Sequence, residues 1–305
     1  HQTVTRLHAE VPSYTIKGLC SLFGASKQAY YKHGDAGIEK AAMVRFIVEY
    51  VKSVREIDKG IGGEKLWHVY TNYFGASYSI GRDAFLKIVR QYNLNLRRPR
   101  KGCRTTNSDH DYPLYPNLIK HLDVSRPNQI WVSDITYIRI LDKFCFLSLV
   151  TDSYNREIVG AYVGPTLETK HTIEALRQAY QKLNPEERTD LIHHSDRGVQ
   201  YASFMYTDEL KSKGIKISMT ENGDPKDNAI AERVNGILKQ EFLNHYEFKT
   251  IDEVRQAVRQ AVEFYNTQRP HRSLDMLTPE QASKKTGYLK KHWVSYKDKY
   301  TNTYL

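Results

Sequence analysis

Residues 191–242 alternate between short apolar stretches and amphipathic ones, and this pattern constrains the fold more than any other feature of the sequence. Residues 191–195 and 215–219 have the length and composition of buried strands. Residues 204–213 and the segment around Glu232 have helical periodicity. Strands that alternate with helices along a chain pair in parallel within a sheet that the helices cover. We therefore expect an α/β domain here.

The upstream sequence predicts the rest of that sheet. Residues 130–141, 144–152 and 157–163 are apolar and joined by short turns, which indicates an antiparallel meander. Helices are expected at residues 169–183 and 253–265. The predicted fold is α/β, a mixed five-stranded sheet with helices on both faces, spanning residues 124–285.

Three acidic residues occupy defined places in this domain. Asp134 lies in the middle of strand 130–141 and shares its parity with isoleucine and valine residues, so its carboxylate faces a buried side. Asp196 follows strand 191–195, and Glu232 lies on the last helix of the alternating stretch. A buried carboxylate is costly unless it is paired or binds a metal, and pairing with an arginine or backbone donors is the alternative for Asp134. Three carboxylates together are oxygen ligands of the kind that Mg²⁺ prefers, so the trio predicts a metal site.

The helix that carries Glu232 has a polar face. Lys239 comes seven residues after Glu232 and therefore lies almost directly below it on an α-helix. Asn228 and Asn235 share the same face. Such a face suits a helix beside a metal and a nucleic-acid backbone, and a solvated face is the alternative.

The spacing of these residues resembles that of a known family. Asp196 and Glu232 are separated by 35 residues, and Asp134 precedes both. In this order they resemble the DDE transposases of bacterial insertion sequences, of the OrfB type of the insertion-sequence-three family, which are relatives of retroviral integrases. The supporting runs are residues 194–198 (HSDRG), 227–232 (DNAIAE) and 265–274 (YNTQRPHRSL).

This resemblance implies a ribonuclease-H-like core that cleaves and joins insertion-sequence ends. Asp134, Asp196 and Glu232 would hold two Mg²⁺ ions, with Mn²⁺ as a substitute. The partners implied are double-stranded DNA (terminal inverted repeats and target), further copies of the chain in a homo-multimer on paired ends, and an upstream segment of OrfA type. The protein would act in the bacterial cytoplasm, at the nucleoid. Residues expected to contact DNA near the metal site are Lys239, Asn228, His194 and Asn235.

The N-terminal sequence predicts two small all-α helix-turn-helix modules, residues 1–35 and 36–96. Residues 14–32 have the pattern of two helices around a turn at residues 24–26, with an ordinary helical hairpin as the alternative. A glycine-containing break at residues 34–37 separates this module from helices expected at 38–57, 64–73 and 80–91. The second helix of the first module would present its DNA contacts, namely Ser26, Lys27, Gln28 and Tyr31.

Charge supports a nucleic-acid partner. The formal net charge is +10 and the isoelectric point about 9.2, which favours a polyanion. Residues 97–123 are predicted to be a basic linker lying along phosphates, with a solvated charge run as the alternative. Its cationic contacts would be Arg97, Arg98, Arg100 and Lys101. The basic, aromatic tail at residues 286–305 could bind nucleic acid or dock on protein, and its pattern leaves both readings open.

Composition narrows the remaining functions. No apolar run is long enough for a membrane span. Cys20, Cys103 and Cys145 are far apart, with no CxxC pair, which fits a reducing compartment and excludes a cysteine-based zinc finger in this sequence. A retroviral-type integrase would carry an N-terminal His/Cys zinc pair, which this sequence lacks. The open alternatives are a DNA-binding regulator with limited catalytic activity and a nuclease that cuts without joining.

Overall fold

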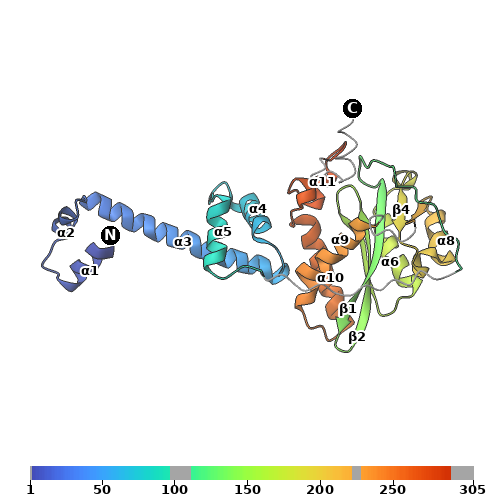
Figure 1. Cartoon of the computed structure of the whole chain (residues 1–305), viewed down its shortest axis with the longest axis horizontal. Coiled ribbons are helices and arrows are strands. Elements are labelled where there is room, and N and C mark those ends of the chain that lie inside the picture. The colour runs from blue at the N-terminus through green and yellow to red at the C-terminus, as the bar shows by residue number, and fades with distance from the viewer. Residues whose placement is uncertain (1, 97–110, 222–227, 290–305) are drawn as a thin grey trace, which may run out of the picture.

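The N-terminal part of the molecule is helical. The computed structural model describes residues 2–96, 111–221 and 228–289. The first helices are α1 (Gln2–Glu10), α2 (Ile16–Leu22), α3 (Lys27–Ile57), α4 (Gly63–Phe74) and α5 (Arg82–Gln91). Figure 1 shows α1 and α2 at one end of the long helix α3, with α4 and α5 packed near its other end, on the side of α10 that faces away from the sheet.

The turn between α2 and α3 forms as its sequence predicts. Gly24 has a φ of 65°, a backbone conformation that glycine adopts without a steric cost. The Ser26 hydroxyl accepts a hydrogen bond from the Ala29 N–H (3.0 Å) and caps α3. Leu19 and Cys20 of α2 are buried against Val4 of α1, which gives this end of the molecule its own small core.

The predicted break at residues 34–37 is wrong. Helix α3 runs without interruption for 31 residues, so the boundary expected between residues 35 and 36 falls inside one helix. Each glycine within a helix costs only about 1 kcal/mol relative to alanine, and no proline removes a backbone hydrogen bond here. The helix-forming residues on both sides outweigh that cost.

The sheet has the predicted topology. Its strands are β1 (Ile130–Ile140), β2 (Lys143–Asp152), β3 (Ile158–Gly164), β4 (Ile192–Ser195) and β5 (Lys216–Met219). Their order is β3-β2-β1-β4-β5, with antiparallel pairing among β1, β2 and β3 and parallel pairing of β4 to β1 and β5. This mixed five-stranded sheet with flanking helices confirms the ribonuclease-H-like fold.

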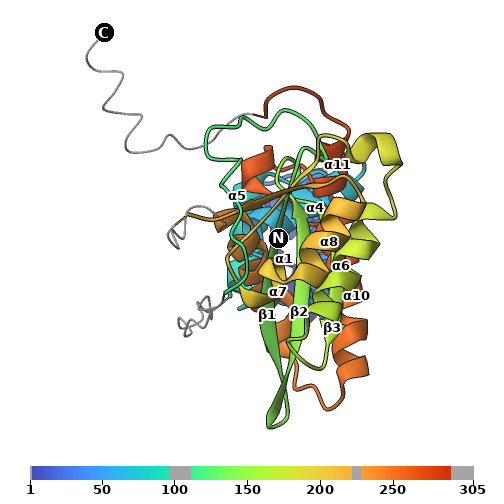
Figure 2. The ribbon, with the colours of Figure 1, turned by 90° about the vertical axis from the view of Figure 1, so that its right-hand side faces the viewer.

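Helices cover both faces of the sheet (Figures 1 and 2). On one side lie α6 (Thr169–Tyr180), α7 (Val199–Ala202) and α8 (Phe204–Ser212), packed around Trp131, Val150 and Leu176. On the other side lie α9 (Ala229–Ile237) and α10 (Ile251–Thr267). The shorter pieces are η1 (Pro185–Arg188), the π-helical η2 (Leu238–Phe242), η3 (Leu243–His245), η4 (Arg272–Leu274) and α11 (Pro279–Ser283).

The helical part docks on the sheet domain through α9, η2 and α10. Ile47 and Tyr70 of the helical part belong to the same buried apolar cluster as Phe242 and Phe264. The helices of residues 36–96 and the sheet domain therefore share a core.

No helix in the described residues is both long and apolar enough to cross a membrane.

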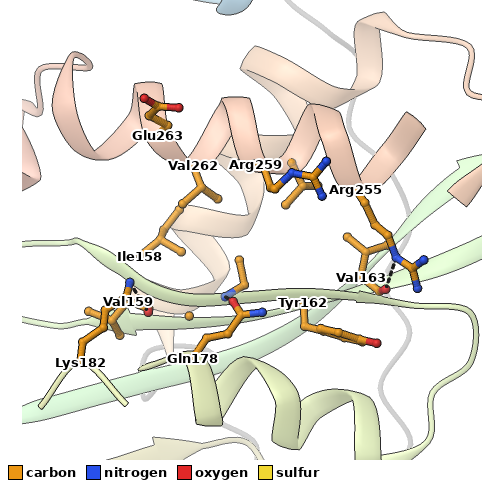
Figure 3. A pocket seen from close by; sticks show the side chains of 13 residues that line it. Ile158, Val159, Tyr162, Val163, Gln178, Lys182, Arg255, Arg259, Val262 and Glu263 are labelled. Carbon is orange, nitrogen blue, oxygen red and sulfur yellow. Dashed lines mark hydrogen bonds between the residues drawn. The ribbon is translucent and has the colours of Figure 1, made fainter. Parts of the chain in front are cut away.

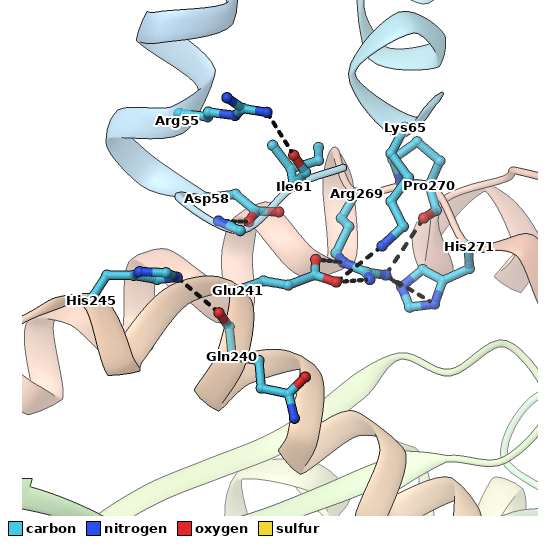
Figure 4. Close-up of polar contacts among 11 residues, drawn as sticks. Arg55, Asp58, Ile61, Lys65, Gln240, Glu241, His245, Arg269, Pro270 and His271 are labelled. Carbon is cyan, nitrogen blue, oxygen red and sulfur yellow. Dashed lines mark hydrogen bonds and ion pairs between the residues drawn. The ribbon is translucent and has the colours of Figure 1, made fainter. Parts of the chain in front are cut away.

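Polar contacts reinforce this junction (Figure 4). The backbone N–H of Gly60 donates to the carbonyl of Glu241 (2.8 Å). The Glu241 carboxylate accepts two hydrogen bonds from the Arg269 guanidinium (2.7 and 2.8 Å) and lies 3.1 Å from the Lys65 ammonium. Arg269 is fully buried, so this ion pair is shielded from solvent.

Candidate active site

Two of the three predicted acids lie side by side in the sheet. Strand β1 runs parallel to β4, and their last registered pair is Ser133 with Ser195. Asp134 is the residue after Ser133, and Asp196 is the residue after Ser195. Adjacent strands lie about 4.8 Å apart. The parallel pairing thus brings together two acids that are 62 positions apart in the sequence.

Asp134 is held by groups of the protein itself. Its Oδ1 accepts the backbone N–H of Ile135 (2.9 Å), and its Oδ2 accepts the side-chain amide of Asn235 on α9 (2.8 Å). Burial raises the pKa of Asp134 to about 7; the Asn235 hydrogen bond opposes this, whereas the charges of Asp196 and Glu232 add to it. No lysine or arginine in the described residues forms an ion pair with Asp134. Of the alternative partners for Asp134, the described residues supply a backbone donor, the Ile135 N–H, and no arginine.

Asp196 has a similar setting at the end of β4. Its Oδ1 accepts the backbone N–H of Gly198 (3.0 Å), and burial raises its pKa. The neighbouring Arg197 donates from Nε to the carbonyl of Thr220 (2.7 Å). The turn 196–198 therefore fixes the carboxylate beside that of Asp134.

Glu232 lies in the first turn of α9 and is exposed. Its charge contributes to the raised pKa of Asp134, which places it in the same electrostatic neighbourhood. Within residues 2–96, 111–221 and 228–289, however, no three His, Cys, Asp or Glu side chains are grouped closely enough to hold a metal ion. The site consists of a pair of aspartates with the third acid on the helix that faces them.

Lys239 lies beside β1, where the charge of Asp134 acts on it. It belongs to the π-helical segment η2, and its Nζ lies 4.1 Å from the centre of the Tyr137 ring on β1. Burial lowers the pKa of Lys239, and the charge of Asp134 opposes that shift. Lys239 thus lies in a π-helical segment after the end of α9, not on the α-helix that the seven-residue spacing assumes, and the charge of Asp134 acts on its ammonium group.

Three residues expected to contact DNA are buried against protein groups instead. Asn228 donates to the Ser133 carbonyl (3.0 Å), and Asn235 donates to Asp134. His194 contacts the Ser218 hydroxyl through Nδ1 (2.8 Å). Direct contact with DNA does not fit the burial of these side chains. Asn228 is the N-cap residue of α9, but its side chain bridges to β1 and makes no capping hydrogen bond.

Comparison with known proteins identifies the family. Residues 124–225 and 213–279 match two family models, each described as an integrase core domain. A 31 kDa protein of insertion element IS600 from Shigella sonnei is 33% identical over 265 residues, which cover 86% of this chain and 96% of that protein. The transposase for insertion sequence element IS629, also from Shigella sonnei, is 28% identical over 278 residues, or 89% of this chain and 92% of that protein. The chain belongs to the DDE transposases of bacterial insertion sequences.

Among solved structures, the transposase is similar to the catalytic core domain of HTLV-2 integrase in complex with magnesium. The identity is 21%, the TM-score is 0.41, and the match covers 52% of the transposase and 97% of the integrase domain.

Sequence reasoning missed a buried histidine behind the two aspartates. His193 Nε2 lies 2.7 Å from the Ser133 hydroxyl and 3.0 Å from the Tyr206 hydroxyl. Burial lowers the pKa of His193 to about 3, so the imidazole is neutral. It joins β1, β4 and α8 of the transposase. Alternation within residues 192–195 was the available signal, because it sends His193 and His194 to opposite faces of the sheet.

The remaining predicted DNA contacts of the transposase lie far from the acids or outside the described residues. Ser26, Lys27, Gln28 and Tyr31 are exposed at the start of α3, at the distal end of the molecule (Figure 1). The following basic residues lie outside the described residues: Arg97, Arg98, Arg100 and Lys101.

Proposed function

We propose that the transposase cleaves the ends of its insertion sequence and joins them to target DNA at Asp134, Asp196 and Glu232. Two Mg²⁺ ions, or Mn²⁺ in their place, are the proposed cofactor. The observation that carries this proposal is the pair of adjacent aspartates without a lysine or arginine ion partner among the described residues. Two such carboxylates repel each other when both are ionised, and a divalent cation between them would offset that repulsion.

The donor set fits Mg²⁺, because it consists of carboxylate oxygens. When bound, the two ions would activate water or a DNA 3′-hydroxyl for attack on a phosphodiester and stabilise the leaving oxygen. Hydrogen-bond donors of the protein orient the two aspartates. Asn235 and the Ile135 N–H orient Asp134, and the Gly198 N–H orients Asp196. Glu232 approaches from α9, and the Lys239 ammonium is proposed to position a DNA phosphate near them.

Binding to DNA is proposed to involve both ends of the molecule. Ser26, Lys27, Gln28 and Tyr31 are the proposed contacts of the distal helical end with the terminal inverted repeats. The proposed active form is a homo-multimer on paired ends, with an upstream OrfA-type segment as a further partner. The sheet domain would then act on a strand held by contacts made elsewhere.

Labelled element-end DNA tests the proposal. We expect Mg²⁺-dependent cleavage and joining by the parent protein, none in EDTA, and none by Asp196→Asn. Asp208→Asn is the matched control, because Asp208 is an exposed aspartate on α8. Binding without cleavage by the parent would identify a DNA-binding regulator. Cleavage without joining would identify a nuclease.

A further inference from the structure

A basic cleft lies on the side of α9 that faces away from the two aspartates. It has a volume of about 590 Å³ and is formed by the start of α4, by α9 and by the segment that follows α10. Figure 4 shows part of one wall, where Lys65, Arg269 and His271 approach one another. The charged residues that line it are Glu64, Lys65, Arg156, Arg233, Arg269 and Arg272.

The charge of this cleft is only partly neutralised. Five of the charged lining residues are cationic and one is acidic. Arg272 pairs with Glu64, and Glu241 behind the wall pairs with Arg269 and Lys65. Within the described residues, Arg156 and Arg233 have no carboxylate within ion-pair distance. Counting Glu241 with Glu64 leaves an excess of three positive charges.

The pKa of His271 shows that the cations of the cleft lie close to one another. His271 is buried in the cleft wall, and its pKa lies well below the ordinary value. Burial is the main cause, and the charges of Arg269, Lys65, Arg156 and Arg233 all lower it further. Four cations from separate segments therefore act on one imidazole.

The cleft and the aspartates share a wall. Arg233 and Ile237 of α9 line the cleft, whereas Asn235 of the same helix donates to Asp134 on the other side. A helix with its side chains is about 10 Å across, so the two sites are separated by about one helix width. A DNA strand held at the acids would therefore carry its neighbouring phosphates to the cleft within a few nucleotides, since the rise is about 3.4 Å per nucleotide.

We propose that this cleft binds backbone phosphates of the DNA on which the transposase acts. Planar guanidinium groups suit phosphate oxygens, and Arg233 is exposed at the mouth of the cleft. This inference rests on the proposed function only in taking DNA as the ligand. Because phosphate contacts do not depend on a divalent ion, DNA binding at the cleft survives the removal of Mg²⁺.

The test is the salt dependence of DNA binding in EDTA. A fluorescein-labelled duplex is titrated with the full chain between about 50 and 200 mM KCl, and log Kd is plotted against log salt. Arg233→Gln is expected to reduce the slope by about 1, which makes the loss of affinity across this range about 4-fold smaller. The matched control is Arg259→Gln, which removes the same charge from an exposed arginine of α10 at the pocket beside β3 (Figure 3).

A second variant keeps the test independent of one side chain. Arg272→Gln removes a cation from the same cleft at an exposed position where it pairs with Glu64, and the double variant with Arg233→Gln should lower the slope further than Arg233→Gln alone. Thermal melting establishes that each variant is folded. An unchanged slope in both cleft variants, or an equal reduction in Arg259→Gln, would overturn the proposal. If the parent protein shows this salt dependence but no metal-dependent cleavage, the proposed chemistry is wrong, and the proposed binding of phosphates at the cleft still stands.

Discussion

Asn235 on α9 donates its side-chain amide to Asp134 on β1 across 2.8 Å; Asn235 is buried and Asp134 is half-buried. This hydrogen bond joins the helix that carries Glu232 to the strand that carries the first aspartate. Asn228, seven residues earlier on the same side, donates to a backbone carbonyl of the same strand (3.0 Å). Two amides therefore fix one helix to one strand, but only one of them touches an acid.

This pair predicts how Asn235→Ala differs from Asn228→Ala. Each change removes a buried hydrogen bond and should cost about 1–3 kcal/mol of unfolding free energy. Only Asn235→Ala also frees the Asp134 carboxylate, so we expect its cleavage rate to fall about 10-fold further than that of Asn228→Ala. Thermal melting and cleavage of element-end DNA provide the two readouts. Equal loss of activity in both variants would mean that Asn235 serves only to dock the helix.

The buried ion pair between Arg269 and Glu241 predicts a large loss of stability on Arg269→Met. Removing one partner of a buried pair costs up to about 3–5 kcal/mol, and Arg269→Met leaves the buried Glu241 carboxylate with only the Lys65 ammonium as a partner. That corresponds to a fall in Tm of about 10 °C in a domain of this size. Arg272→Met is the control: its side chain is 80% exposed and pairs with Glu64 at the surface, so the change should cost less than about 1 kcal/mol. Similar Tm values for the two variants would show that the junction does not depend on the buried pair.

Asp58 predicts a pH-dependent stability at the same junction. It is fully buried, and its Oδ1 accepts the Gly60 N–H (3.2 Å). Burial, and then the charge of Glu241, raises the pKa of Asp58 to about 8, although Arg269 and Lys65 oppose this. In the unfolded chain an aspartate has a pKa of about 3.9. The folded state therefore binds the proton more tightly, and the stability that this provides is present below about pH 4 and lost as pH rises through about 8.

Asp58→Asn should remove the loss of stability that accompanies rising pH. We expect the variant to melt several degrees above the parent at about pH 8 and by a much smaller margin at about pH 5. Asp83→Asn on α5 provides a control, because the Asp83 side chain is 86% exposed. A margin that is the same at both pH values would argue that Asp58 is already ionised at about pH 5.

The sheet domain could be predicted in detail because its signals are local. Apolar runs mark β1, β2 and β3, and short turns between them specify antiparallel pairing. The ion pair of Glu241 with Arg269 could not be predicted in this way, since a charged residue on a helix has the same local pattern whether it is solvated or buried. Lys65 and Glu241 are 176 positions apart, and only the docking of α4 brings them together. The partners of the Asn228 and Asn235 side chains could not be predicted for the same reason. The sequence predicts that the two residues share a helical face, but it does not indicate which strand covers that face.

Gly60 gives the sharpest test of how the helical part docks on the sheet domain. A Cβ at this position would lie 2.4 Å from the Cα of Glu241, a backbone atom that cannot move aside without shifting η2. Its N–H also donates to the Glu241 carbonyl (2.8 Å). We therefore expect Gly60→Ala to separate the two parts locally, with a loss of about 2–4 kcal/mol in unfolding free energy and faster amide exchange in α4 and η2.

Gly62 is the matched control, two residues away. A Cβ there would meet no atom within 4 Å, and the backbone φ of −74° suits any residue. Gly62→Ala should therefore change the unfolding free energy by less than about 1 kcal/mol. Because Lys239 and Glu241 belong to the same π-helical segment, a shift of η2 in Gly60→Ala should also reduce cleavage of element-end DNA. If Gly60→Ala and Gly62→Ala melt and cleave alike, the close approach of Gly60 to Glu241 does not hold the two parts of the molecule together.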